Sequence, residues 1–311
     1  MEPIQTGIVG FGKIARDAHR PSIRANPAFE LAATASCDAG EPGLAHFSRI
    51  EDMLEDVPQL TAVAICTPPQ VRYHAARLAL EHGKHVLLEK PPCSSVLELE
   101  HLAALAKSAG KTLYQTWHSR EASAVEPAAN ELRRRKLRAV RITWKEDVRT
   151  WHPGQQWLWE PGGFGVFDPG INALSILTQV ITEPLFARSA HFDIPGNCAT
   201  PIAAELALET ASGVPIAASF DFRLRGKPVW SIDFETDQGP LGLLDGGTRL
   251  QLGDEPAPLA RARLGREYAA IYRRFAELIA RGESEVDTRP LACVADLFLV
   301  ARHFTVEPFP G

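Results

Sequence analysis

The chain has 311 residues, an ordinary balance of apolar and charged side chains, and a formal net charge of −5. This length predicts one large or two medium domains with a sizeable core, and the acidic balance argues against a nucleic-acid-binding surface. No apolar run reaches the length of a membrane span, and the N-terminus shows no signal-peptide pattern, so we expect a cytoplasmic protein. The five cysteines are scattered without metal-ligand spacing, which predicts reduced thiols and no metal site.

A glycine-rich turn follows the first predicted strand, residues 4–9, and opens a helix toward Asn26. It reads Gly-Phe-Gly-Lys-Ile-Ala, the G-x-G-x-x-A pattern at a strand-to-helix junction. The first glycine allows a tight turn, the second lets the backbone approach a pyrophosphate, and the alanine lets helix and strand pack closely. The helix N-terminus adds unpaired N–H groups and a positive dipole end. The pattern therefore predicts that a dinucleotide is bound by Gly10, Gly12, Lys13, Ile14 and Ala15.

The second predicted strand, residues 29–36, ends at the position where such folds contact the adenosine ribose. The residues at this end are Ser36, Cys37 and Asp38. Asp38 is placed to accept a hydrogen bond from the ribose 2′-hydroxyl, and its charge repels a 2′-phosphate, whereas Ser36 suits either group. The predicted cofactor is therefore NAD or NADP, with a lean to NAD. Dual use stays open because Arg16 or Arg49 could approach the same position.

Strands and helices alternate through the rest of the first half. Buried strands are predicted at 61–66, 85–88 and 112–116, and helices at 71–82 and 94–109. This alternation predicts an α/β fold with a parallel doubly wound sheet, whose ligands lie where the strands end. The residues that follow those ends are assigned to the cofactor, at Thr67, Pro68, Glu89 and Lys90, and to the substrate, at His118. A structural role for His118 is an equal alternative.

The pattern changes after a predicted helix over residues 122–136. Alternating apolar and polar residues then predict an open, mostly antiparallel sheet, with strands at 138–145, 185–193, 203–210, 214–223, 229–236, 241–244 and 249–252. Helices are predicted over 266–281 and 290–303. We therefore expect a dinucleotide-binding Rossmann domain over 1–120 and an α+β domain over 121–311 for substrate binding and oligomerisation. The last helix could pack back on the first domain, and a homo-oligomer would form through the open sheet, whose outer side must be covered or solvated.

Residues 146–165, between the first two strands of the second domain, are rich in aromatic and polar side chains. Three tryptophans fall within the nine residues 151–159. Aromatic faces stack on the C–H faces of sugars, while carboxylates, amides and histidine bond to hydroxyl groups. Glu146, Trp151 and His152 are therefore candidate substrate-binding residues. The alternative is a structural loop whose tryptophans anchor it to the core.

Asp168 and Asn172 stand four residues apart at the start of a predicted apolar helix. That spacing puts both side chains on one face of the helix, one turn from each other. Asp168 would also serve as a helix N-cap followed by Pro169 at the first helical position. Capping alone would explain the aspartate but not the asparagine.

Taken in order, Gly10-x-Gly12-x-x-Ala15, Glu89-Lys90-Pro91 and Asp168-x-Gly170-x-Asn172 resemble the Gfo/Idh/MocA family of nicotinamide-dependent sugar oxidoreductases, over essentially the whole chain. Longer runs at 64–73, 116–120, 144–149 and 167–176 are similar to the bacterial L-arabinose and D-galactose 1-dehydrogenases of that family. The general family pattern has a histidine where this chain has Asn172. The aldose 1-dehydrogenase branch is similar to this chain in carrying asparagine there.

The resemblance implies oxidation of the C1 hydroxyl of L-arabinopyranose, D-galactopyranose and D-fucose to an aldonolactone, with no metal. Asp168 would accept the hydroxyl proton, Asn172 would orient a sugar oxygen, and Lys90 would stabilise developing negative charge. Lys90 is the alternative base. Three rival functions stay open. They are a sugar- or nucleotide-sensing regulator without turnover, a metal-dependent enzyme using Glu146, His152 and Asp168, and a dehydrogenase of cyclic polyols or another aldose.

Overall fold

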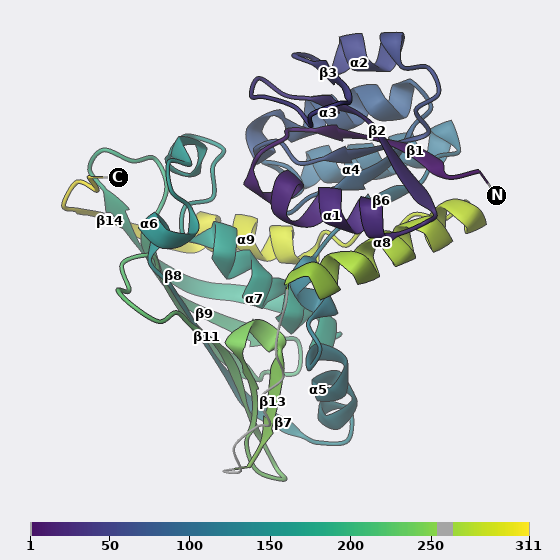
Figure 1. Cartoon of the computed structure of the whole chain (residues 1–311). Coiled ribbons are helices and arrows are strands. Elements are labelled where there is room, and N and C mark those ends of the chain that lie inside the picture. Colours follow the sequence, from purple (N-terminus) through teal and green to yellow (C-terminus); the bar gives the residue numbers. More distant parts are fainter. Residues whose placement is uncertain (1, 254–263, 311) are drawn as a thin grey trace. The chain divides into compact units, whose positions relative to one another are not determined.

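Two compact units make up the part of the chain that the computed structural model describes, residues 2–253 and 264–310. Residues 2–121 and 264–288 form the first unit, and residues 122–253 and 289–310 form the second. The first unit is therefore built from two segments that are far apart in the sequence. Each unit contains one β-sheet with helices packed on it (Figure 1), which confirms the predicted α/β class.

The sheet of the first unit has six parallel strands in the order β3-β2-β1-β4-β5-β6. The strands are β1 (Ile4–Val9), β2 (Phe29–Ala35), β3 (Ala45–Phe47), β4 (Ala62–Ile65), β5 (His85–Leu88) and β6 (Leu113–Gln115). β4 and β5 are short apolar runs, as expected when both faces of a parallel sheet are covered. The strand order reverses between β1 and β4, which is where open α/β sheets bind ligands. The sequence pattern does not predict β3, a short edge strand.

The helices of the first unit include one from its second segment, residues 264–288, which is called the late segment below. The full set is a π-helical turn η1 (Ala15–His19) that continues into α1 (Arg20–Ala25), then α2 (Ile50–Asp56), α3 (Pro69–Glu81), α4 (Val96–Ala109), the 3₁₀ turn η2 (His118–Glu121) and α8 (Leu264–Arg281). α4 begins with a reciprocal capping box between Ser95 and Glu98. α8 packs against α1 and η2, and its Tyr268, Tyr272 and Phe275 are fully buried in the core of the unit.

The second unit contains an eight-stranded sheet in the order β13-β12-β11-β7-β10-β9-β8-β14. Its strands are β7 (Leu137–Lys145), β8 (Leu185–Pro195), β9 (Ala203–Thr210), β10 (Pro215–Asp221), β11 (Val229–Thr236), β12 (Leu241–Leu244), β13 (Arg249–Leu252) and β14 (Ala301–Val306). β10 pairs with β7 in parallel, as does β14 with β8, and the other neighbours are antiparallel. The predicted mostly antiparallel sheet is confirmed.

The end of the chain differs from its prediction. The sequence pattern predicts one helix over 290–303, but α9 (Arg289–Val300) stops at Val300 and the next six residues form β14. No glycine or proline lies between the two elements, so the sequence carries no stop signal there. Tertiary pairing decides the outcome, because β14 runs along β8 and Phe304 stacks on His191 with 4.0 Å between ring centroids.

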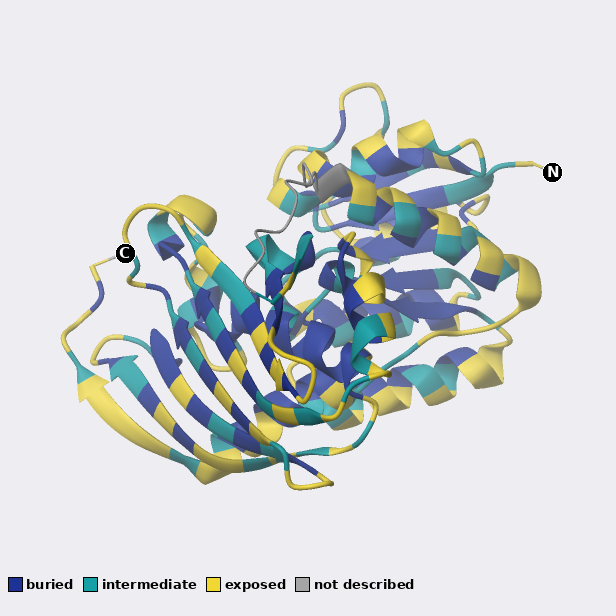
Figure 2. Cartoon of the chain, turned by 90° about the horizontal axis from the view of Figure 1, so that it is seen from below, coloured by how far each residue is buried: buried dark blue, intermediate teal, exposed yellow. Residues whose placement is uncertain are grey.

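Helices α7 and α9 lie on one face of this sheet (Figure 1). The helical elements of the unit are α5 (Val125–Leu132), which ends earlier than the predicted 122–136, α6 (Val148–Trp151), η3 (Gln156–Trp159), α7 (Phe167–Val180), η4 (Asp245–Gly247) and α9. α7 approaches the sheet closely at Gly170, where an added Cβ would lie 2.5 Å from the ring of Phe220. Along the strands, buried and exposed residues alternate (Figure 2), so one face is packed and the other faces solvent.

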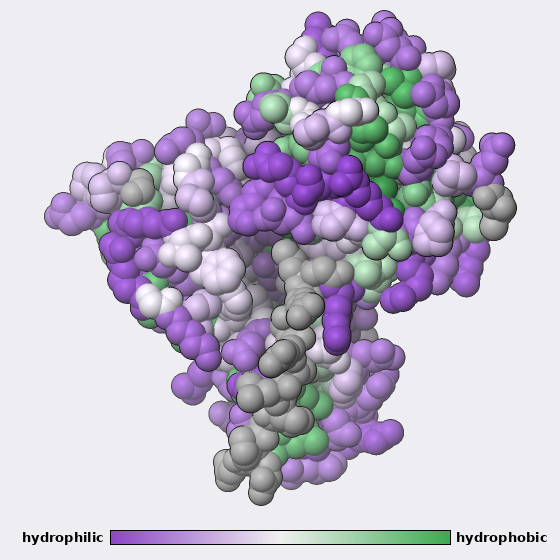
Figure 3. All heavy atoms as spheres, in the orientation of Figure 1, coloured by the Kyte–Doolittle hydropathy of each residue, from purple (hydrophilic) through white to green (hydrophobic). Residues whose placement is uncertain are grey.

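Hydrophilic side chains dominate the face of the molecule drawn in Figure 3, with hydrophobic side chains gathered mainly over the first unit. Large exposed hydrophobic side chains are scattered singly along the described residues, for example Leu97 on α4 and Phe304 on β14. Among the helices that the structure describes, none combines the length and the apolar character that crossing a membrane requires.

Candidate functional site

The turn after β1 has the backbone geometry that a pyrophosphate loop requires. Gly10 adopts a φ of 84°, and a Cβ at this position would lie 2.7 Å from the backbone nitrogen of Thr67. Around Gly12, by contrast, a Cβ would meet nothing within 4 Å. The loop is therefore packed on β4 at Gly10 and has open backbone at Gly12, which fits a dinucleotide phosphate. Lys13, Ile14 and Ala15 continue from it into the helical turn η1.

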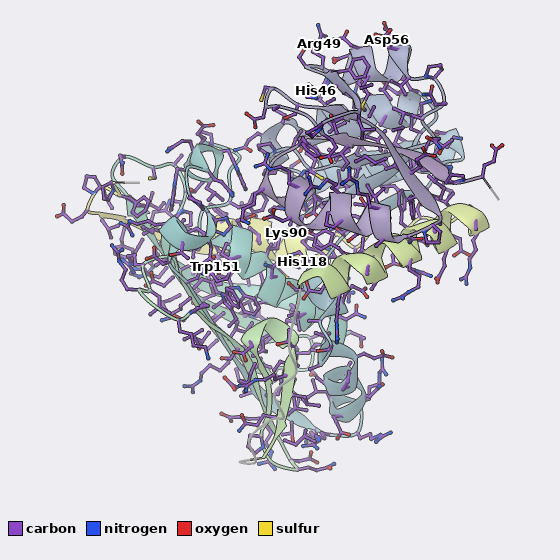
Figure 4. All side chains as sticks on the ribbon, in the orientation of Figure 1. His46, Arg49, Asp56, Lys90, His118 and Trp151 are labelled. Carbon is purple, nitrogen blue, oxygen red and sulfur yellow. The ribbon has the colours of Figure 1, made fainter. Side chains whose placement is uncertain are left out.

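The predicted ribose-binding residues follow β2 and face solvent. Asp38 and Cys37 are exposed, and the backbone N–H of Asp38 donates to the Ser36 hydroxyl over 3.2 Å. Both arginines that could have approached this position already bind protein groups. Arg16 donates to the carbonyl of Phe11 over 2.7 Å, and Arg49 pairs with Glu51. Figure 4 shows Arg49 and His46 in the α2–β3 region.

A buried polar cluster surrounds Glu89, at the carboxyl end of β5. Its Oε1 accepts hydrogen bonds from His19 Nε2 over 3.0 Å and from the Tyr268 hydroxyl over 2.7 Å. Its Oε2 accepts the backbone N–H of Lys90 over 2.9 Å. The other ring nitrogen of His19 lies 2.9 Å from the hydroxyl of Tyr272. All four side chains are 2% exposed or less, so this cluster is sealed from solvent.

Charge in this cluster is set by its internal contacts rather than by burial. Burial by itself would raise the pKa of Glu89, but the hydrogen bond and charge of His19, with smaller contributions from His118 and Tyr268, hold that pKa well below its usual range. Burial would lower the pKa of His19, but Cys66, Tyr272 and Glu89 together raise it well above its usual value. Glu89 is therefore a carboxylate at neutral pH, and the raised pKa of His19 favours its imidazolium form.

Arg72 connects the ends of β4 and β5. From the first turns of α3, its guanidinium donates to the carbonyl of Glu89 over 2.9 Å and to the carbonyls of Pro91 and Thr67. The peptide bond between Lys90 and Pro91 is cis. Arg72 thereby holds the backbone of two predicted cofactor residues, Thr67 and Glu89, on neighbouring strand ends, and Lys90 lies between its contacts at Glu89 and Pro91.

His118 lies on η2, at the same end of the first unit as Lys90 (Figure 4). Its Nδ1 lies 2.9 Å from Glu267 on α8, and its ring stacks on Tyr268 at 5.9 Å. Sequence reasoning assigned His118 to the substrate or to a structural role. The structure gives it structural partners from the late segment.

Three predicted substrate-site residues meet in the second unit. His152 Nε2 lies 3.1 Å from Glu146 Oε1, and His152 Nδ1 lies 3.6 Å from Asp168 Oδ2. Glu146 follows β7, His152 follows α6, and Asp168 is in the first turn of α7. Both carboxylates are buried, while the histidine side chain is 15% exposed. The imidazole of His152 therefore hydrogen-bonds one buried carboxylate, Glu146, and lies near a second, Asp168, at the edge of solvent. Its Nδ1 also lies 3.3 Å from Gln155 Oε1.

Asp168 does not cap its helix, so the capping interpretation is wrong. α7 begins at Phe167, and Val166 occupies the N-cap position without a side-chain capping bond. Asp168 and Asn172 lie one turn apart within the helix, as their spacing predicts. Asn172 is partly exposed, and its carbonyl accepts the hydroxyl of Ser175 over 2.7 Å.

Two of the three tryptophans in the 146–165 stretch, Trp151 and Trp159, have different surroundings. Trp159 packs against Phe309 and Phe222, with ring centroids 5.1 and 5.9 Å apart, and so anchors the loop. Trp151 is 43% exposed and meets the ring of Trp230 edge-on at 5.1 Å. The anchoring interpretation therefore describes Trp159, and Trp151 keeps a face available for a ligand.

Sequence reasoning missed Trp230, Tyr268 and Arg72. Trp230, on β11, donates its indole N–H to Glu146 Oε2 over 2.8 Å. Trp230 pairs across the sheet with Trp144, two residues before Glu146. The contact of Trp230 with Glu146 could therefore have been predicted only from the register of the two strands. Within the described ranges, no group of three or more histidine, cysteine, aspartate or glutamate side chains is arranged to hold a metal ion.

Comparison with known proteins agrees with this fold. Residues 4–116 match the GFO_IDH_MocA model, an oxidoreductase family with an NAD-binding Rossmann fold. The chain is 43% identical to a galactose 1-dehydrogenase from Pseudomonas fluorescens, over 99% of both chains. The crystal structure of a D-galactose-1-dehydrogenase from Rhizobium etli is 47% identical, with a TM-score of 0.91 over 99% of this chain and 98% of that one. A 3-ketoreductase from Actinomadura kijaniata shares the fold at 20% identity, with a TM-score of 0.84 over 99% of this chain and all of that one.

The fold and the glycine-rich loop define an oxidoreductase that binds a nicotinamide dinucleotide. More narrowly, the chain belongs to the Gfo/Idh/MocA oxidoreductase family, which confirms the resemblance drawn from its motifs.

The sealed Glu89–His19 pair predicts how stability depends on pH. The lowered pKa of Glu89 contributes stability that is present above the ordinary carboxylate range and lost as pH falls through the lowered pKa. The raised pKa of His19 contributes stability that is present below the ordinary imidazole range and lost as pH rises through the raised pKa. Glu89→Gln should therefore lower the free energy of unfolding by about 3 kcal/mol at neutral pH, and the loss should shrink in acid.

Urea unfolding over a pH series measures this difference, with the exposed Glu30→Gln as the matched control in the same unit. A loss in Glu89→Gln no larger than the control's, or one independent of pH, would contradict the assignment of charges.

Proposed function

We propose that this protein is an NAD(P)-dependent aldose 1-dehydrogenase that oxidises the C1 hydroxyl of D-galactopyranose and L-arabinopyranose, and of D-fucose, to the aldonolactone. The observation that carries the proposal is the buried Glu146–His152–Asp168 assembly, in a chain whose full-length relatives include galactose 1-dehydrogenases. L-Arabinopyranose and D-galactopyranose share the ring configuration at C2, C3 and C4 and differ by one hydroxymethyl group. Such a group is worth only about 1–3 kcal/mol of discrimination, so we expect overlapping activity.

The proposed roles follow from the chemistry of each side chain. Asp168 accepts the proton of the C1 hydroxyl, because it is a buried carboxylate with the imidazole of His152 3.6 Å away. His152 holds Asp168 in place and is itself held by Glu146. Asn172 orients the sugar oxygen, and Lys90 stabilises the negative charge that develops on it.

Glu146, Trp151, His152 and His118 complete the proposed substrate set. Trp151 offers an exposed indole face to the C–H face of the sugar ring. When bound, oxidised nicotinamide supplies the hydride acceptor for C1. The coenzyme is held at Gly10, Gly12, Lys13, Ile14 and Ala15, at Ser36, Cys37 and Asp38, and at Thr67, Pro68 and Lys90. Glu89, whose side chain is sealed from solvent, supports the backbone of Lys90 instead.

Turnover and one substitution test the proposal. Purified protein should reduce NAD+ or NADP+ in the presence of D-galactose, L-arabinose or D-fucose, read at the reduced-nicotinamide absorbance band. Asp168→Asn keeps the size of the side chain but cannot accept the proton, so kcat should fall by about 10³. Asp233→Asn, on β11 of the same unit, is the control and should keep its activity. The proposal fails if none of these sugars is oxidised, and the role of Asp168 fails if its variant turns over normally.

We also propose that NAD is preferred over NADP because Asp38 is exposed at the end of β2 and the two candidate arginines, Arg16 and Arg49, bind other groups. Asp38→Ala should shift the ratio of kcat/KM for the two coenzymes toward NADP by about tenfold or more, since a charge repulsion is removed. Asp56→Ala, at the end of α2, is the control for a lost surface carboxylate. An unchanged ratio would show that Asp38 does not read the ribose.

The proposed function also includes self-association through the eight-stranded sheet. The solvent-facing side of the eight-stranded sheet carries two exposed phenylalanines: Phe186 on β8, 44% exposed and beside the mutually paired Arg188 and Glu209, and Phe304 on β14, 45% exposed and stacked on His191. A second copy of the chain would cover this apolar and charged surface. Sedimentation equilibrium should show self-association that Phe304→Glu weakens. A single monomeric species of the wild type at micromolar concentration would contradict it.

A further inference from the structure

Glu89 and Lys90 are adjacent in the chain, and their charges are opposite. A carboxylate beside an ammonium group normally attracts it and favours its protonated form. Both carboxylate oxygens of Glu89, however, accept hydrogen bonds from groups other than the Lys90 side chain. Oε1 accepts from His19 and Tyr268, and Oε2 accepts the backbone N–H of Lys90. Glu89 therefore binds the main chain of Lys90 and directs its own charge to His19.

The backbone around His19 is shaped for this contact. His19 ends the π-helical turn η1, in which the N–H of Arg20 donates to the carbonyl of Ala15, one residue further back than in an α-helix. Ala15, Ala18 and His19 are the buried residues of this turn. Turns of this kind are often found at functional sites. Here the turn follows the pyrophosphate loop directly and carries the imidazole to the end of β5.

We propose that His19 is a positioning residue for Lys90: its imidazolium neutralises Glu89, so that Glu89 fixes the backbone of Lys90 without cancelling the charge that the Lys90 side chain brings to the reaction. This inference rests on the proposed function for the role of Lys90. It adds to that function a residue remote in sequence that sets the electrostatics of the lysine.

The other charged and titratable groups around the pair leave this balance in place. Cys66 at the end of β4 and Tyr272 on α8 face His19. Tyr268 on α8 and His118 on η2 face Glu89, and Glu267 pairs with His118. Arg72 binds the carbonyl of Glu89 rather than its carboxylate. Among these described groups, His19 makes the largest favourable contribution to the ionised form of Glu89.

The test measures the protonation of the Lys90 amine directly and needs no substrate. The full chain is treated with a trace of acetic anhydride, which acetylates only unprotonated amines, and the acetylation of Lys90 is measured by mass spectrometry over a pH series. In His19→Gln the carboxylate of Glu89 loses its counter-charge, so the midpoint for labelling Lys90 should rise by about half a pH unit or more. The double variant His19→Gln with Glu89→Gln should return it to the wild-type midpoint.

Two control variants distinguish the loss of the His19 charge from a change in local structure. Tyr268→Phe removes a neutral hydrogen bond to the same carboxylate oxygen and should leave the midpoint within about 0.2 units, because no charge changes. His82→Gln replaces an exposed histidine of the same unit and should behave as wild type. An unchanged midpoint in folded His19→Gln overturns the proposal, as does an equal rise in Tyr268→Phe.

The charge of His19 is also measured in the unaltered protein, which guards against a variant that does not fold. Nuclear magnetic resonance of ¹⁵N-labelled histidine should show His19 as an imidazolium at neutral pH, and a neutral ring there overturns the proposal. If the wild type oxidises no aldose, the proposed function fails while the labelling result still decides the role of His19. If turnover is found, His19→Gln should lower kcat about tenfold or more and leave the dissociation constant for coenzyme within about threefold, since the pyrophosphate loop is unaltered.

Discussion

All strands of the parallel sheet end at one edge, and the arrangement of the first unit depends on this constraint. Residues that follow β1, β4 and β5 meet there although long stretches of sequence separate them. Gly10 approaches the backbone of Thr67 so closely that no side chain fits between them. Arg72 then joins Thr67 to Glu89 and Pro91 through their carbonyls. The loops that would hold a coenzyme are thus fixed by close backbone packing at Gly10 and by the hydrogen bonds of one buried arginine to backbone carbonyls.

In both units a buried carboxylate is bonded to a histidine and to the donor group of an aromatic side chain, which offset the cost of its burial. Glu89 has His19 and Tyr268, and Glu146 has His152 and Trp230. The two assemblies differ in access to solvent. His19 is completely buried, whereas the side chain of His152 is 15% exposed and has a second carboxylate, Asp168, on its other nitrogen. A sealed pair is suited to hold charge in a fixed place, and a partly open one is suited to exchange a proton with a bound molecule.

The sequence was sufficient where function depends on local pattern. The spacing of Gly10, Gly12 and Ala15, the strand ends before Thr67 and Glu89, and the four-residue step from Asp168 to Asn172 are visible without a structure. Features that depend on register or on tertiary pairing were not visible. The residues of β14 fit the pattern of a helix end, and they form a strand because they pair with β8. Trp230 contacts Glu146 because β11 pairs with β7 in one particular register.

The late segment explains why the cluster around Glu89 could not be assembled from the motifs. The bond from Tyr268 to Glu89 spans 179 positions, and the contact of His118 with Glu267 spans 149. Without α8, Glu89 and His19 would each lose a hydroxyl partner, and the core of the first unit would lack three large aromatic rings. The nucleotide-binding unit is therefore complete only after the chain has passed through the whole sheet of β7 to β13 and returned. The motif Glu89-Lys90-Pro91 locates the buried carboxylate in the sequence, but its side-chain partners His19 and Tyr268 come from η1 and α8, which the motif does not contain.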